Sequence, residues 1–231
     1  MGIKERQERD REAVRRAILD AARELFVAEG FQHVSIRKIA ERIEYSPAAI
    51  YSYFASKDDI FLALAAEGFH RLDEKVRAAM NTDNPIENVR ACWWAFYEFS
   101  QEHTAYFELM FVDRSVPRIT QQWEGFEFLQ QMLTHAVSAI QRAIDAGQFP
   151  ATLSPNAAMH MLWASLIGPA VVGNRHRLAS GEDYDALARD VLNATIAGLQ
   201  AGVVTTFVSC KCPEEGIAGA PVPAGVRSHE S

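Results

Sequence analysis

Apolar residues recur every three or four positions through most of this 231-residue chain, and this spacing decides the fold class. The segment REAVRRAILDAARELFVAEG, residues 11–30, shows it most clearly, because its apolar residues form one continuous stripe on a helix. A strand that is buried on one face requires alternating apolar and polar residues, and no such pattern of useful length occurs in the sequence. We therefore predict an all-α protein of about nine helices.

Capping residues divide the first quarter of the chain into short helices. Ser35 and Ser46 stand where a side-chain oxygen can accept a backbone N–H at a helix start, and Pro47 suits the first helical position. These signals predict helices over 35–43 and over 46–54. The same periodicity predicts further helices over 56–80, 85–101, 103–112, 121–146, 155–177 and 183–204.

Charge is distributed unevenly along the chain. The net charge is −7, yet residues 1–57 carry 11 Lys and Arg against 9 Asp and Glu, whereas residues 58–231 carry 12 against 21. The excess of acid therefore lies outside the first quarter. The weakly basic first quarter suits a polyanionic partner, although a solvated helix face would show the same balance.

Targeting signals and cysteines bear on the compartment. No basic and apolar leader opens the sequence, and the longest apolar run, AAMHMLWASLIGPAVVG, is short for a membrane span and is interpreted as a buried helix. Three cysteines without a secretory signal favour a reducing compartment. We expect a cytoplasmic protein that makes no membrane contact.

The helices over 35–43 and 46–54 are separated by about three residues, which is the spacing of a helix-turn-helix. In that motif the second helix enters the major groove of DNA. Ala40 is small enough for two helices to cross closely there. The side chains expected to face inward, against Ile18, Leu25 and Phe26 of the first helix, are Ile39, Ile43, Ile50 and Phe54.

The run SIRKIAERIEYSPAAIYSYFASKDDIF, preceded by a helix that ends in ELFVAEGF, resembles the DNA-binding domain of TetR-family transcriptional regulators over about residues 12–62. The resemblance implies an all-helical homodimer with a DNA-binding domain at 1–57 and a larger effector-binding and dimerisation domain at 58–205. One departure is Glu44, which stands in the turn where the family usually has Gly. Residues 206–231 are rich in Pro, Gly and Ala and are predicted to be a disordered tail.

Residues 46–60, SPAAIYSYFASKDDI, gather the hydrogen-bond donors that phosphate oxygens require. The resemblance places Tyr51, Tyr53 and Lys57 at the DNA backbone, and Arg37 at a position that can contact a base. The alanines of the second helix leave only apolar contact with thymine methyl groups. The predicted DNA-binding residues are Ser35, Arg37, Ser46, Pro47, Ala48, Ala49, Tyr51, Ser52, Tyr53 and Lys57.

The first residues of the chain allow two interpretations. Lys4, Arg6 or Arg9 could enter a neighbouring minor groove, as basic arms do in other DNA-binding proteins. The interleaved acids are equally compatible with a solvated helix start.

Large aromatic side chains gather in the second half of the chain, as in CWWAFYEFSQEHTAYFELMF. Such faces either leave a cavity between helices for a small apolar ligand or form a filled core. The segment WASLIG resembles a Trp-Ala-x-Leu-His-Gly segment of some TetR effector domains, and Ile167 in place of the histidine favours an apolar effector. The residues predicted to line an effector pocket are Trp93, Tyr97, Met110, Trp123 and Trp163.

The last two helices are predicted to pair with their copies in a four-helix dimer interface. The residues assigned to it are Trp163, Leu166, Val191, Leu192, Ile196 and Leu199. Dimerisation would set two DNA-binding domains one helical turn of DNA apart.

Sequence motifs for catalysis are absent, and neither a metal nor a cofactor is predicted. Glu67-x-x-His70 is half of a di-iron bundle motif without its second copy, and Cys210-Lys-Cys212 lacks a second ligand pair. The sequence therefore predicts a ligand-responsive repressor that binds a palindromic operator. The alternative is a helical interaction protein or ligand-binding module that no longer binds specific DNA.

Overall fold

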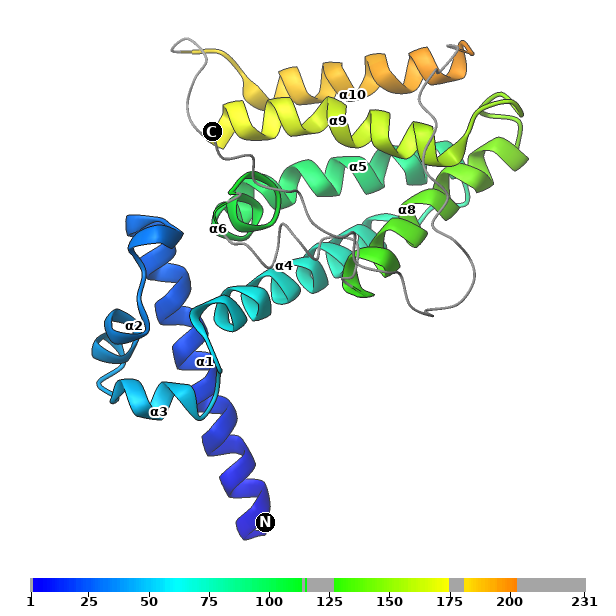
Figure 1. Ribbon diagram of the computed structural model, residues 1–231. Coiled ribbons are helices and arrows are strands. Elements are labelled where there is room, and N and C mark those ends of the chain that lie inside the picture. The colour runs from blue at the N-terminus through cyan, green and yellow to red at the C-terminus, as the bar shows by residue number, and fades with distance from the viewer. Residues whose placement is uncertain (1, 114, 116–126, 175–180, 203–231) are drawn as a thin grey trace, which may run out of the picture.

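The structure, a computed structural model, describes residues 2–113, 115, 127–174 and 181–202, and it is all-helical within these ranges, as the sequence predicts. Figure 1 shows a small N-terminal group of helices and a larger stack of helices, with a long helix leading from the first group into the second. The elements are α1 (Ile3–Glu29), a 3-10 turn (Phe31–His33), α2 (Ile36–Arg42), α3 (Pro47–Tyr51), α4 (Lys57–Ala79), α5 (Pro85–Glu102), α6 (Thr104–Phe107), a π-helical turn (Glu108–Val112), α8 (Glu127–Asp145), α9 (Pro155–Asn174) and α10 (Tyr184–Gln200).

Both predicted serine caps are confirmed. Ser35 Oγ accepts the backbone N–H of Lys38, with 3.2 Å between the two atoms, and Ser46 Oγ accepts that of Ala49 at 3.1 Å. The end of α3 differs from the prediction, because the helix stops at Tyr51 and Phe54 lies beyond it. There the Ser52 hydroxyl donates to the Ala49 carbonyl, and the backbone N–H groups of Ser52 and Tyr53 donate to carbonyls three residues earlier, as in a 3-10 turn.

The N-terminal domain is held together by a small apolar core. Ile18 of α1, Ile39 of α2 and Ile50 of α3 are completely buried, as their spacing predicts. Phe61 of α4 is also completely buried and packs edge-on against Phe31, with 4.9 Å between ring centroids. The predicted domain boundary at residue 57 thus falls at the first residue of a helix whose first turns complete the core of the N-terminal domain.

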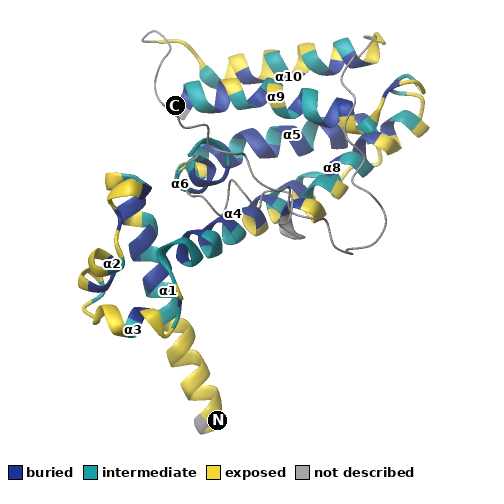
Figure 2. Cartoon of the chain, viewed as in Figure 1, coloured by how far each residue is buried: buried dark blue, intermediate teal, exposed yellow. Residues whose placement is uncertain are grey.

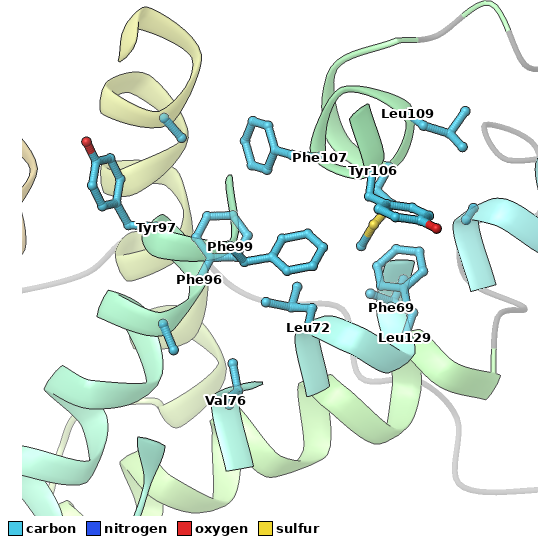
Figure 3. Close-up of a cluster of buried hydrophobic side chains, with 14 of the residues drawn as sticks. Phe69, Leu72, Val76, Phe96, Tyr97, Phe99, Tyr106, Phe107, Leu109 and Leu129 are labelled. Carbon is cyan, nitrogen blue, oxygen red and sulfur yellow. The ribbon is translucent and has the colours of Figure 1, made fainter. Parts of the chain in front are cut away.

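The C-terminal domain is built around α5, which contacts α4, α8, α9 and α10. Figure 3 shows phenylalanine and leucine side chains from α4, α5 and α8 meeting in its interior. The helix predicted over 103–112 divides into α6 and the π-helical turn. The predicted helix at 121–146 is described from Glu127 only, and the predicted tail at 206–231 lies outside the described residues.

The α9 and α10 helices pack against each other and against α5. One prediction for the dimer interface is wrong, because four of its residues are at most 2% exposed within the single chain and so cannot face a partner. These residues are Leu166, Leu192, Ile196 and Leu199. Their apolar stripe is used to join the two helices to the chain's own core.

Candidate nucleic-acid interface

The exposed side of α3 carries the hydroxyl donors that the sequence singles out. Ile50 anchors the helix from below, and the Tyr51 side chain on the other side is 56% exposed. Ser46 and Ser52 are exposed and Tyr53 is half-buried. We call the surface formed by Ser46, Tyr51, Ser52 and Tyr53 the α3 face. Its phenol groups stand at the end of a short helix on the outside of the molecule, where a polyanion can reach them.

Lys57 is less free than the sequence suggests. Its Nζ donates to the carbonyl oxygens of Phe31 at 2.9 Å and of Val34 at 3.0 Å, and it lies 3.9 Å from the centroid of the Phe31 ring. Burial lowers the pKa of Lys57, although neighbouring Asp58 favours the charged form. An ammonium has three donors, so one remains for a phosphate oxygen. Lys57 therefore also ties the start of α4 to the 3-10 turn.

Arg37 lies on the solvent side of α2. Its Nε donates to Glu41 Oε1 at 2.8 Å, and the Arg37 side chain is 82% exposed. The hydrogen bond to Glu41 raises the pKa of the guanidinium. An ion pair so exposed to solvent is weak, so Arg37 can exchange it for a base edge or a phosphate.

Glu44 occupies the turn between α2 and α3 in the left-handed conformation, with a φ of 58°. A side chain disfavours this conformation by about 1 kcal/mol relative to glycine. The turn nevertheless closes, and the Tyr45 N–H donates to the Ala40 carbonyl at 2.9 Å. The departure from glycine thus leaves the geometry of the motif intact and places a strained residue within it.

A charged network joins the N-terminal domain to the rest of the chain, and sequence reasoning missed it. Glu67 of α4 accepts from Arg16 of α1 at 2.6 Å, from Arg71 at 2.7 Å and from the Tyr106 hydroxyl of α6 at 2.8 Å. We call these four residues the α1–α4–α6 junction. The four-residue spacing of Glu67 and Arg71 was the only signal in the sequence.

The junction also contains a close helix approach. Gly68 of α4 faces Met110 and Tyr106, and a methyl group at this position would collide with the Met110 sulfur. The guanidinium of Arg23 lies 5.7 Å and that of Arg71 lies 5.5 Å from the centroid of the Tyr106 ring. Tyr106 is thereby held between a cation of α1 and a cation of α4.

The residues predicted to line an effector pocket lie in different surroundings. The Tyr97 hydroxyl donates to Asp185 of α10 at 2.9 Å, whereas Met110 lies against Gly68 of α4. Figure 3 shows the Tyr97 hydroxyl pointing away from Tyr106. Trp163 is half-buried on α9, and Trp123 lies outside the described residues. The predicted pocket stays a prediction.

Trp93 differs from the other predicted pocket residues. It is 5% exposed, and its indole N–H has no hydrogen-bond partner in the described part of the chain. A buried N–H without a partner costs about 1–3 kcal/mol. A ligand oxygen would satisfy this donor.

The structure also bears on a metal site and on a membrane span. Among the described residues, no three His, Cys, Asp or Glu side chains are placed to hold a metal ion, and the Glu67 carboxylate is occupied by the junction. Cys210 and Cys212 lie outside the described residues. None of the described helices combines the length and apolar character needed to cross a membrane.

Comparisons with known proteins agree with this geometry. Residues 18–64 match the sequence profile described as bacterial regulatory proteins, tetR family. The HTH-type transcriptional repressor AcnR of Corynebacterium diphtheriae is 28% identical over 176 residues, which are 76% of this chain and 86% of that protein. The uncharacterized HTH-type transcriptional regulator YdeS of Bacillus subtilis is 26% identical over 200 residues, 84% of this chain and 93% of that protein.

Solved structures show the same fold beyond the N-terminal domain. The transcriptional regulator FadR from Bacillus subtilis, in complex with stearoyl-CoA, superposes with a TM-score of 0.67 over 79% of this chain and 97% of that chain, at 20% identity. With its helix-turn-helix and these relatives, the chain is a DNA-binding transcriptional regulator whose N-terminal domain, over residues 18–64, matches the tetR family of bacterial regulatory proteins.

Proposed function

We propose that the protein is a homodimeric repressor that binds an inverted-repeat operator in the cytoplasm and is released by a small apolar effector. The observation that carries the DNA-binding part is the α3 face, where Tyr51 is 56% exposed above a fully buried Ile50. A rigid apolar underside fixes the direction of the phenol groups. Donors held in this way can meet phosphate oxygens without a change in the fold.

On DNA, the predicted residues divide into two groups. Hydroxyl groups of the α3 face, the Ser35 hydroxyl and the remaining donor of Lys57 contact phosphates and set the register of α3 in the major groove. Arg37 exchanges its contact with Glu41 for a base edge, and Ala48 and Ala49 contact thymine methyl groups. Specificity then resides mainly in one arginine and in the shape of the operator.

The dimer interface is assigned to the outer sides of α9 and α10. Ala164 and Gly168 of α9 are exposed one turn apart, with half-buried Trp163 and Ile167 beside them. Leu187 of α10 is 39% exposed. Small residues flanked by large apolar ones allow two helices to approach closely, so this side suits a second copy of the same helices. The interface then sets two α3 helices about 34–36 Å apart.

For the effector, a long-chain acyl thioester is the first candidate, because the structurally similar FadR from Bacillus subtilis holds stearoyl-CoA. The aromatic interior around α5 suits an acyl chain, and the Trp93 N–H offers a donor for a carbonyl or other ligand oxygen. Ligand binding beside α4 would displace this helix and change the separation of the two α3 helices. A coupling of about 1–3 kcal/mol is typical of such linkage.

Selection of bound fragments from the source genome tests the proposal. Footprinting of the selected fragments should show a protected inverted repeat, and sedimentation should show a dimer in the complex. Stearoyl-CoA should then lower operator affinity, whereas free CoA, which lacks the acyl chain, should not.

Two other outcomes would contradict parts of the proposal. Binding of acyl-CoA without any protected DNA at low salt would favour a ligand-binding module that no longer binds specific DNA. Protected DNA that no acyl-CoA releases would leave the regulator assignment in place and exclude this effector class.

A further inference from the structure

The first turns of α1 form a rigid extension on the side of the molecule that carries α3. The helix begins at Ile3 and continues without interruption to Glu29, so the first residues do not form an extended arm. Residues 4–13 are all exposed. Figure 2 shows these turns projecting beyond α3, away from α5 and α9.

Arg11 establishes which side of the extension faces α3. Its guanidinium lies 5.7 Å from the centroid of the Tyr53 ring, and that of Arg15 lies 5.3 Å from the centroid of the Phe54 ring. Residues seven apart lie on nearly the same side of a helix, so Lys4 and Ile18 share the side of Arg11. This stripe is apolar where α1 packs into the N-terminal domain, and it becomes basic where α1 projects past it.

The opposite side of the extension differs in its charge. Arg9 is two residues from Arg11, which turns it by roughly 200° around the helix. Arg6, also on that side, lies 4.0 Å from the Asp10 carboxylate. No carboxylate of the described residues forms an ion pair with Arg11, although Glu8, one turn away, offsets part of the charge. Arg9 likewise forms no ion pair with a described carboxylate, so what distinguishes Arg11 is its position beside Tyr53, on the side of the helix that faces α3.

We propose that Arg11 and Lys4 form a second contact with the DNA backbone, with the first turns of α1 lying along the phosphates beside the groove that α3 enters. This inference rests on the proposed DNA binding. When α3 lies in the major groove, the two phosphate strands border it, and a rod that projects past α3 runs beside one of them. The Arg11 guanidinium then offers its paired N–H groups to phosphates next to those contacted by Tyr53.

Salt dependence of DNA binding by the full-length protein tests the inference, with a duplex of random sequence as the probe. Arg11→Gln should reduce the slope of log K against log salt concentration by about 0.9, which weakens binding roughly five- to tenfold at about 0.1 M salt. Lys4→Gln should act in the same direction. Arg9→Gln is the matched control, because it removes the same charge from the opposite side of the same helix and should leave the slope unchanged.

Arg11→Lys retains the charge and should retain the slope, which separates the phosphate contact from any loss of packing on Tyr53. An Arg11→Gln slope equal to that of the wild type would overturn the inference. Equal losses for Arg9→Gln and Arg11→Gln would also overturn it, because binding would then depend on total charge and not on one helix side. If DNA binding by the wild-type protein did not depend on salt, the proposed DNA-binding function itself would be contradicted.

Discussion

The α3 face and the α1–α4–α6 junction use similar chemical groups in opposite ways. At the junction, the Glu67 carboxylate satisfies two arginines and a tyrosine hydroxyl from three helices. On the α3 face, Tyr51 stands 56% exposed. The junction holds two parts of one molecule together, whereas the α3 face leaves the Tyr51 hydroxyl for a partner. Substitutions at the junction should therefore change stability, and those on the α3 face should change DNA affinity.

Replacement of Glu67 by Gln should give the largest effect. Glutamine removes the charge that three donors share and leaves Arg71 without a carboxylate partner, although Asp20 still pairs with Arg16, so the free energy of unfolding should fall by about 2–4 kcal/mol. Denaturant unfolding measures this change. Glu41→Gln, which breaks an exposed pair with Arg37, is the control and should change stability little.

The wild type and Glu67→Gln, compared at different pH values, give a second test of the junction. Burial raises the pKa of Glu67, but the hydrogen bonds from Arg71, Tyr106 and Arg16 together lower it below its ordinary value of 4.5. The stability contributed by the ionised carboxylate is present above about pH 4.5 and is lost as the pH falls through the lowered pKa. The difference between the wild type and Glu67→Gln should therefore shrink below this pH. A difference that stays constant down to full protonation would contradict the role of the charge.

Lys57 combines features of both regions. Its replacement by Met removes the donor of two backbone carbonyls and should lower the free energy of unfolding by about 1–3 kcal/mol, in addition to weakening DNA binding. Thermal unfolding and binding to a duplex, measured on the same preparation, check the two effects. Loss of DNA affinity with unchanged stability would mean that the carbonyl contacts contribute nothing to the fold.

Tyr51→Phe should separate binding from folding. The phenyl ring keeps its position while the hydroxyl is lost, so DNA affinity should fall by about 1–2 kcal/mol on every sequence and thermal stability should stay the same. Equilibrium binding to operator and to random duplexes measures the effect. A loss confined to one sequence would assign Tyr51 to base recognition.

Glu44→Gly should have the smallest effect. Glycine adopts a φ of 58° without a steric penalty, so the variant should gain at most about 1 kcal/mol of stability. Denaturant unfolding measures the gain, and Glu41→Gly, inside α2, should instead lose stability. A loss at both positions would mean that the Glu44 side chain contributes contacts that outweigh its strain.

Local features were predictable from the sequence, and contacts between distant segments were not. The caps of α2 and α3 and the buried Ile39 and Ile50 follow from residue types and spacing over a few positions. The Lys57 contact with Phe31 spans 26 residues and the Tyr97 contact with Asp185 spans 88. Periodicity fixes which side of a helix is apolar but not which helix covers it.

The dimer interface illustrates this limit. Leu192 and Ile196 are predicted to face a second copy, and the structure instead buries them in the chain's own packing, where α9 and α10 contact each other. The exposed small residues Ala164 and Gly168 on α9 give no comparable periodic signal. Burial within one chain has to be known before the remaining surface can be assigned.

The unbroken length of α1 has a mechanical consequence. Lys4, at its outer tip, and Arg16, at the junction, are 12 residues apart on one helix, which corresponds to about 18 Å along the helix axis. A tilt that moves the tip across the duplex also moves Arg16 relative to Glu67 of α4. The tilt of α1 therefore links the position of Lys4 at the DNA to the position of Arg16 against α4, because both residues belong to one continuous helix.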